Sequence, residues 1–123
     1  MKSKDTETIK FYVHDDGILY IECLPGTIMT IDEGKLSTKI GLELTEGNAM
    51  PLLCDLQNVV KMNQECRSYF AGPVHAEMFT KCALLITNPI SRIIGNFFLG
   101  ANKPLRPTRL FTKKEEAIKW LKN

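Results

Sequence analysis

Residues 51–67, PLLCDLQNVVKMNQECR, give the strongest indication of the fold. Their apolar run stops abruptly at Asp55, and short runs of this kind are typical of strands buried on both faces of a sheet. A helix is expected to begin near Asn63, because asparagine is a favourable N-cap residue. Strand, acidic residue, loop and helix N-terminus follow one another in many phosphate-binding sites, and also wherever a strand is merely connected to a helix.

Asp55 itself has two interpretations. Open α/β sheets place their sites at the carboxyl ends of strands, where a carboxylate can bind or polarise a ligand. The favoured alternative is local: an aspartate at this position accepts hydrogen bonds from backbone amides of the turn at 56–58.

The flanking sequence continues the alternation of strands and helices. A hairpin is expected from two β-rich runs, 8–14 and 18–24, joined by the turn residues 15–17. Three more strands are expected, at 50–56, 82–87 and 108–112. Helices are expected at 31–46, from Asn63, from Pro73 through Thr80, at 89–101 and at 113–122. Two of these helix starts, Thr30–Glu33 and Thr112–Glu115, match the capping box.

This order of elements predicts the fold class. Strands that alternate with helices indicate a single α/β domain whose mixed sheet has about five strands, with an N-terminal hairpin and four to five covering helices. The domain is expected to span residues 8–123, and residues 1–7 are expected to form a flexible N-terminal tail.

The composition is that of an ordinary globular domain. The chain has 123 residues, of which 44% are hydrophobic and 24% charged, and a domain of this size can bury a core without metals or disulfides. No apolar run approaches the roughly 18 residues of a transmembrane helix. The N-terminus MKSKDTET lacks the apolar core of a signal peptide, so a cytoplasmic location is expected.

Catalytic, metal and cofactor sites are not predicted. The chain has no histidine at metal-ligand spacing, no paired carboxylates, no Ser-His or Cys-His signature and no glycine-rich phosphate loop, so we expect a protein that is not an enzyme. The cysteines are expected to be buried thiols; they are Cys23, Cys54, Cys66 and Cys82. Basic residues are scattered without interleaved aromatics, which argues against nucleic-acid binding.

Residues 55–67, DLQNVVKMNQECR, resemble the D-L-x-x-V-x-x-[IM]-D-S-S-G-L signature of STAS domains, which have the anti-sigma-factor-antagonist fold. Four residues occupy its positions: Asp55, Leu56, Val59 and Met62. Four further segments are similar to the bacterial SpoIIAA-like family, a STAS/SEC14-type domain: EGNAMPLLCDLQNV, ECRSYFAG, ALLITNPISRIIGNFFLGANKPLRPTRLFT and KKEEAIKWL. The resemblance covers roughly residues 8–122 and implies a STAS-like fold.

The chain departs from this family at the regulatory serine. Asn63, Gln64 and Glu65 stand where the signature has aspartate and two serines, so the phosphoacceptor position holds Glu65. The helix dipole favours an anion at this end, and a glutamate supplies part of that charge permanently. Glu65 therefore either mimics a modified state or, the favoured interpretation, is an ordinary first-turn acid that contributes about 0.3–1 kcal/mol.

The resemblance implies a regulatory or interaction module that lacks the phosphoacceptor serine and binds a protein partner through the loop and helix at 57–70. The expected partner-binding residues are Asp55, Asn58, Asn63, Gln64, Glu65 and Ser68. The sequence leaves open whether the protein forms a homodimer.

Helix 89–101 supports an alternative from another class, a protein that binds lipid or a small apolar ligand and contacts membranes peripherally. Its apolar residues form one stripe, with basic residues nearby, as in an interfacial helix. The candidate contacts are Arg92, Phe97, Phe98 and Leu99. A helix that covers a sheet has the same stripe, and this simpler interpretation is favoured. It predicts that the core residues are Ile90, Ile93, Ile94 and Phe97, with Phe98 and Leu99 nearer the edge.

Overall fold

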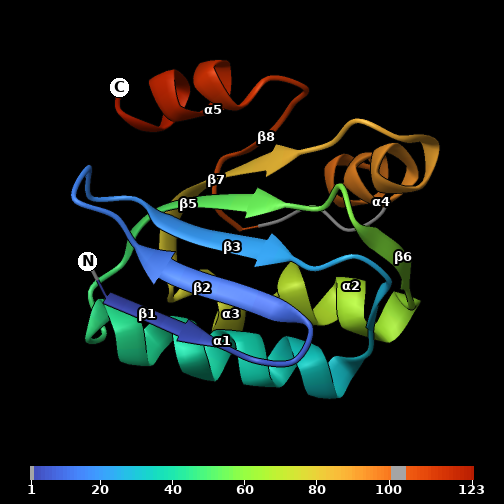
Figure 1. Cartoon of the computed structure of the whole chain (residues 1–123), viewed down its shortest axis with the longest axis horizontal. Helices are drawn as coiled ribbons and strands as arrows, with labels where there is room; N and C mark the ends of the chain where they lie inside the picture. Colours follow the sequence, from blue (N-terminus) through green and yellow to red (C-terminus); the bar gives the residue numbers. More distant parts are fainter. Residues whose placement is uncertain (1, 101–104) are drawn as a thin grey trace.

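A computed structural model describes residues 2–100 and 105–123, and within them a six-stranded sheet forms the centre of the domain. Its strand order is β1-β2-β3-β5-β7-β8 (Figure 1). The strands are β1 (Lys2–Asp5), β2 (Ile9–Val13), β3 (Leu19–Cys23), β5 (Met50–Asp55), β7 (Phe79–Leu85) and β8 (Thr108–Phe111). The first three pair antiparallel and the remaining pairs are parallel, so the predicted mixed α/β sheet with an N-terminal hairpin is confirmed.

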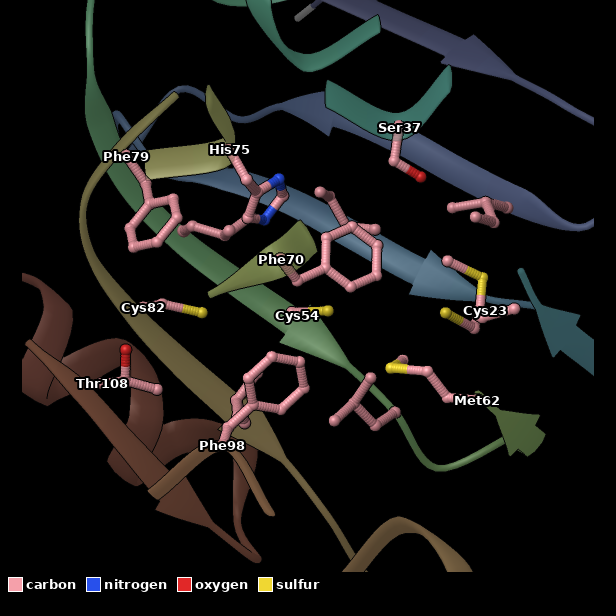
Figure 2. A pocket seen from close by; sticks show the side chains of 16 residues that line it. Cys23, Ser37, Cys54, Met62, Phe70, His75, Phe79, Cys82, Phe98 and Thr108 are labelled. Carbon is pink, nitrogen blue, oxygen red and sulfur yellow. The ribbon is translucent and has the colours of Figure 1, made fainter. Parts of the chain in front are cut away.

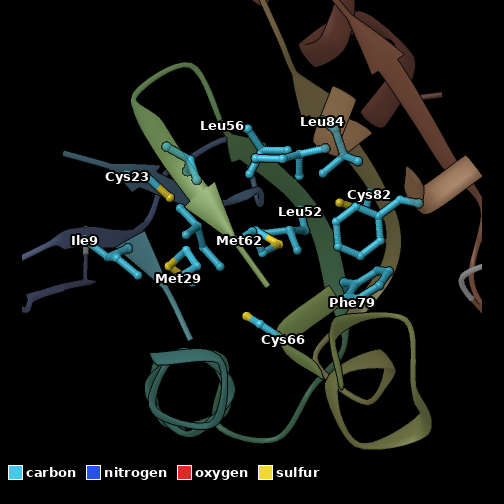
Figure 3. Close-up of a cluster of buried hydrophobic side chains, with 14 of the residues drawn as sticks. Ile9, Cys23, Met29, Leu52, Leu56, Met62, Cys66, Phe79, Cys82 and Leu84 are labelled. Carbon is cyan, nitrogen blue, oxygen red and sulfur yellow. The ribbon is translucent and has the colours of Figure 1, made fainter. Parts of the chain in front are cut away.

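Helices cover both faces of the sheet, but unequally (Figure 1). The helices are α1 (Ile31–Thr45), α2 (Gln64–Phe70), α3 (Pro73–Ala76), α4 (Pro89–Leu99) and α5 (Lys114–Leu121). Side chains of α1, α2 and α4 pack into one buried cluster on one face of the sheet, and His75 of α3 packs against Phe70 of α2 beside it. Figure 3 shows strand side chains of this cluster together with Cys66 of α2. The fifth packs alone on the opposite face, where Ala117 and Leu121 meet Leu53 and Leu85.

Three short strands were not expected from the sequence. Lys2–Asp5 forms β1 where a flexible tail is predicted, because its backbone pairs with β2 and its lysines reach Glu43 of α1 and Glu46, which follows the helix. The strands β4 (Thr27–Met29) and β6 (Val59–Met62) pair with each other in a separate two-stranded sheet. Their three and four residues are too few to produce a periodic pattern in the sequence.

The helix ends match the predictions in part. The Asn63 side chain caps α2 as expected, since its Oδ1 accepts the Cys66 amide at 2.9 Å. Neither predicted capping box forms: the Thr30 side chain makes no cap bond, and α5 is preceded by Lys113 rather than Thr112. The predicted helix through Thr80 is also wrong, because α3 ends at Ala76 and β7 begins at Phe79 to pair with β5.

Two glycines that disfavour a helix by propensity lie inside α1 because another element comes close. A Cβ added at Gly41 would lie 1.8 Å from the Met78 sulfur, and one at Gly34 would lie 3.2 Å from the Tyr69 ring. Close packing of α1 against the segment before β7 and against α2 therefore outweighs the helix-propensity cost of about 1 kcal/mol per glycine.

Candidate partner-binding site

The segment that connects β5 to α2 is fixed by its own side chains. The Asp55 Oδ1 atom accepts the Gln57 backbone amide at 2.9 Å, and the Gln57 side-chain amide donates to both carboxylate oxygens at 3.0 Å. This confirms the favoured interpretation of Asp55 as the acceptor of a local turn. Its carboxylate is occupied by the loop and serves to shape it.

Neighbouring loops hold the same turn in place. Asn58 donates to the Cys23 carbonyl at 3.2 Å, so its amide points toward the end of β3. From the other side, Asn88 donates to the Gln57 carbonyl at 2.5 Å, and the Thr87 hydroxyl donates to the Gln57 side-chain oxygen at 3.0 Å. The Asn58 side chain therefore ties the loop to the end of β3.

The first turns of α2 bring together three of the predicted residues. Gln64, Glu65 and Ser68 are exposed, and with Ile31 and Tyr69 they line a shallow groove between the start of α1 and α2. Asn63 lies beside them and caps the helix. The six predicted residues thus divide into three that line the groove and three that shape the loop or cap the helix. Ile31 and Tyr69 were not predicted, because nothing in the local pattern indicates that α1 begins next to α2.

Arg67 links α2 to α4, and sequence reasoning also missed it. Its guanidinium donates to the Met62 carbonyl at 2.5 Å, and its central carbon lies 4.0 Å from the centroid of the Phe97 ring. A cation above an aromatic face contributes about 0.5–1 kcal/mol at a partly exposed site. Arg67 therefore fixes α2 relative to α4.

The exposed face of α4 corrects the predicted orientation of that helix. Ile94 and Phe98 are buried, at 4% and 6% exposure, whereas Ile93 and Phe97 are 61% and 37% exposed. Ile90 and Leu99 are exposed as well. The predicted core positions of Ile90, Ile93 and Phe97 are therefore wrong, and so is the edge position of Phe98.

The cause of this error is the width of the apolar stripe on α4, which is broader than the sheet can cover. Gly95 decides which part is buried: a Cβ there would lie 2.9 Å from Leu110 and 3.3 Å from Ile86, so the helix turns this side toward the sheet. Arg92 lies on the exposed side. The last position of the predicted helix 89–101, residue 101, lies outside the described part of the chain.

Comparison with known proteins places the chain in a family. A family model described as a domain of unknown function, DUF7793, matches residues 11–123. The chain belongs to the DUF7793 family. Among curated protein sequences nothing matches significantly.

Solved structures share the fold of this DUF7793 chain. An uncharacterised protein of the DUF3478 family with a SpoIIAA-like fold, from Shewanella loihica, is 16% identical with a TM-score of 0.66, over 98% of this chain and 99% of its own. An anti-sigma factor antagonist from Mycobacterium paratuberculosis is 13% identical with a TM-score of 0.66, over 94% of each chain. Unphosphorylated SpoIIAA is 14% identical with a TM-score of 0.61, over 94% of this chain and 98% of its own. The fold is therefore SpoIIAA-like, as the sequence resemblance implies.

Neither a membrane-spanning helix nor a metal centre is found in the described part of the chain. No helix among residues 2–100 and 105–123 combines the length and apolarity needed to cross a membrane. No group of three or more histidine, cysteine or acidic side chains within the same ranges is arranged to hold a metal ion.

Proposed function

We propose that this protein is a non-enzymatic, STAS-like interaction module that binds a protein partner through the groove between α1 and α2. The observation that carries the proposal is the grouping of Gln64, Glu65 and Ser68 at one exposed surface with Ile31 and Tyr69. Such a surface combines a charged group, hydrogen-bonding groups and an aromatic ring, the last of which is enriched in protein interfaces.

The state of the thiols and of His75 supports a binding role over a catalytic one. Burial raises the pKa of Cys23, Cys66 and Cys82 to about 12, so these thiols are protonated near neutral pH and are poor nucleophiles. Burial lowers the pKa of His75 to about 3, which leaves its imidazole neutral and a very weak base. Neither these three thiols nor His75 has the properties of an activated nucleophile or a general base.

The module is proposed to work without a phosphoserine at the start of α2. The sequence resemblance implies that Glu65 stands at the phosphoacceptor position. Its carboxylate lies in the first turn of α2, where it is proposed to supply a fixed negative charge. Its side chain is exposed, which makes the charge accessible to a partner. A partner that recognises this charge would bind constitutively.

The test is quantitative partner capture by immobilised wild-type protein, Glu65→Gln and Glu65→Ser. Both variants should retain the fold and capture less partner, because each removes the fixed charge. A matched control is Glu116→Gln in the first turn of α5, on the opposite face of the sheet. Equal capture by wild type and both Glu65 variants would leave Glu65 with a structural role only. Stoichiometric phosphorylation of Ser68 with a change of partner would contradict the absence of a phosphoswitch.

A second candidate function, peripheral membrane contact, is supported by the exposure of Ile90, Ile93 and Phe97 on α4, with Arg92 on the same helix. Apolar side chains next to a cation are what an interfacial helix inserts into an anionic bilayer. Co-sedimentation with vesicles of anionic and of neutral lipid, at two salt concentrations, tests this. Binding that needs anionic lipid, weakens with salt and is lost in Ile93→Glu supports it.

The same stripe could instead pair with a second copy of the chain. Sedimentation of wild type and Ile93→Glu without vesicles separates the two explanations. If both proteins are monomers, membrane contact remains the second candidate function. If wild type is a dimer and Ile93→Glu is a monomer, dimerisation through the stripe replaces it.

A further inference from the structure

A cavity of about 50 Å³ lies inside the larger buried cluster, between the sheet and the helices α1 to α4 (Figure 2). Its wall is mostly apolar and includes Leu52, Phe79 and Phe98. Native interiors are close-packed, so a void larger than a water molecule has few counterparts in a domain of this size. The nature of its few polar groups determines what it can hold.

Ser37 is the polar group that the cavity leaves unsatisfied. It projects from α1 toward the cavity and is 2% exposed (Figure 2). Its hydroxyl has no hydrogen-bond partner among the described residues. A buried hydroxyl without a partner is costly, and native structures satisfy the great majority of such groups.

Each of the other two polar side chains of the wall, His75 and Thr108, has a hydrogen-bond partner within the protein. The Nδ1 atom of His75 lies 2.9 Å from the Thr38 hydroxyl, and its ring packs between Phe70 and Phe79 at centroid distances of 4.6 and 5.4 Å. The Thr108 hydroxyl donates to the Arg106 carbonyl at 3.0 Å. Because the imidazole is neutral, neither His75 nor Thr108 brings a charge to the cavity.

Cys54 also lines this cavity. This thiol keeps some accessible surface, yet burial raises its pKa well above the usual range. The two observations agree if the accessible surface of Cys54 faces the internal cavity, which it lines, and not bulk solvent. Its position fits this explanation, because the side chain projects from β5, a central strand of the sheet.

We propose that this cavity binds a small neutral molecule with an apolar body and one hydroxyl or carbonyl group, held by a hydrogen bond to Ser37. A charged ligand is excluded, since an ion without a counter-charge in an apolar site is strongly disfavoured. A water molecule is held poorly there, because it needs about two to four polar partners. A cavity of about 150 Å³ binds benzene, so this one suits about two or three non-hydrogen atoms, the size of a short-chain alcohol or aldehyde.

The experiment uses the full-length chain with ¹³C-labelled methionine methyl groups and ethanol as the probe. Met29 and Met62 line the cavity, whereas Met78, also buried, does not and serves as the internal reference. Ethanol should shift the Met29 and Met62 signals saturably and leave Met78 unchanged. In Ser37→Ala, binding should weaken about fivefold, the value of one ordinary hydrogen bond.

Xenon is the control, because it fills apolar space without hydrogen bonding. Xenon should shift the Met29 and Met62 signals equally in wild type and Ser37→Ala. Such a result would show that the cavity persists in the variant. The proposal is overturned if ethanol gives no saturable shift at Met29 and Met62, if it binds both proteins equally, or if a slowly exchanging water occupies the site and ethanol does not displace it.

Discussion

The two faces of the sheet differ in what they contain. On one face, α5 alone covers a small apolar cluster built around Leu53, Leu85 and Leu121. On the other face lie α1 to α4, the cavity, the Ser37 hydroxyl, which has no hydrogen-bond partner among the described residues, and two exposed surfaces, the groove at α2 and the stripe on α4. The comparison suggests that the α5 face mainly stabilises the domain, and that function is concentrated on the face of α1 to α4.

The largest expected effect distinguishes two adjacent phenylalanines on α4. Phe98→Ala should cost about 3–5 kcal/mol of unfolding free energy, because a buried aromatic leaves a cavity. Phe97→Ala should cost only about 1 kcal/mol, since Phe97 is partly exposed and loses mainly its contact with Arg67. Urea unfolding of both variants measures the difference. A larger loss for Phe97→Ala than for Phe98→Ala would show that α4 is oriented as the sequence pattern predicts, and equal losses would contradict the difference in burial.

The next largest expected effect is the pH dependence of stability caused by His75, the buried histidine on the face of α1 to α4. The pKa of His75 is about 3 in the folded protein, against an ordinary value of 6.5 in the unfolded chain. Between these values the unfolded state binds more protons than the folded state. The contribution of His75 to the free energy of unfolding is therefore fully present above pH 6.5 and is lost as the pH drops toward 3. The slope is at most about 1.4 kcal/mol per pH unit.

Unfolding free energies of wild type and His75→Gln, measured from pH 7 to pH 4, check this. The variant should lose that part of the pH dependence, while His14→Gln, which removes a histidine outside the buried cluster, reports any unrelated effect. Parallel curves for wild type and His75→Gln would mean that His75 is not buried in its neutral form.

The smallest expected effect on stability belongs to the groove at α2. Glu65→Gln should change the unfolding free energy by less than about 1 kcal/mol, because the Glu65 side chain is exposed and interacts with the helix dipole through solvent. Thermal unfolding at low and high salt measures this contribution. A loss of several kcal/mol would make Glu65 a structural residue and would remove it from the proposed partner surface.

The sequence predicted the elements better than their orientation. Strands β2, β3 and β5 follow from strong local patterns, and the fold class follows from the order of the elements. Helix α1 was predicted correctly although Gly34 and Gly41 disfavour a helix. The short strands β1, β4 and β6 could not be predicted, because pairing partners far away in the chain stabilise them. The rotation of α4 could not be predicted either, since it depends on how Gly95 meets Leu110 and Ile86 in the folded chain.

The candidate site was predictable to a similar extent. Gln64, Glu65 and Ser68 were predicted because they lie in the first two turns of one helix, which follows a recognisable strand. Ile31 and Tyr69 complete the groove through the packing of α1 on α2, and Arg67 reaches α4 across a gap of 30 residues in the sequence, from position 67 to 97. Contacts of this kind depend on tertiary structure and leave no local signal.

Site-specific photo-crosslinking tests the central claim, partner binding at the groove between α1 and α2, most directly. Benzoylphenylalanine would replace Gln64 in the groove or, as the control, exposed Lys119 on α5. We predict a crosslink to one defined protein from position 64, absent from position 119 and reduced when Glu65→Gln is added. Crosslinks of equal yield from both positions, or a yield from position 64 that Glu65→Gln leaves unchanged, would contradict it.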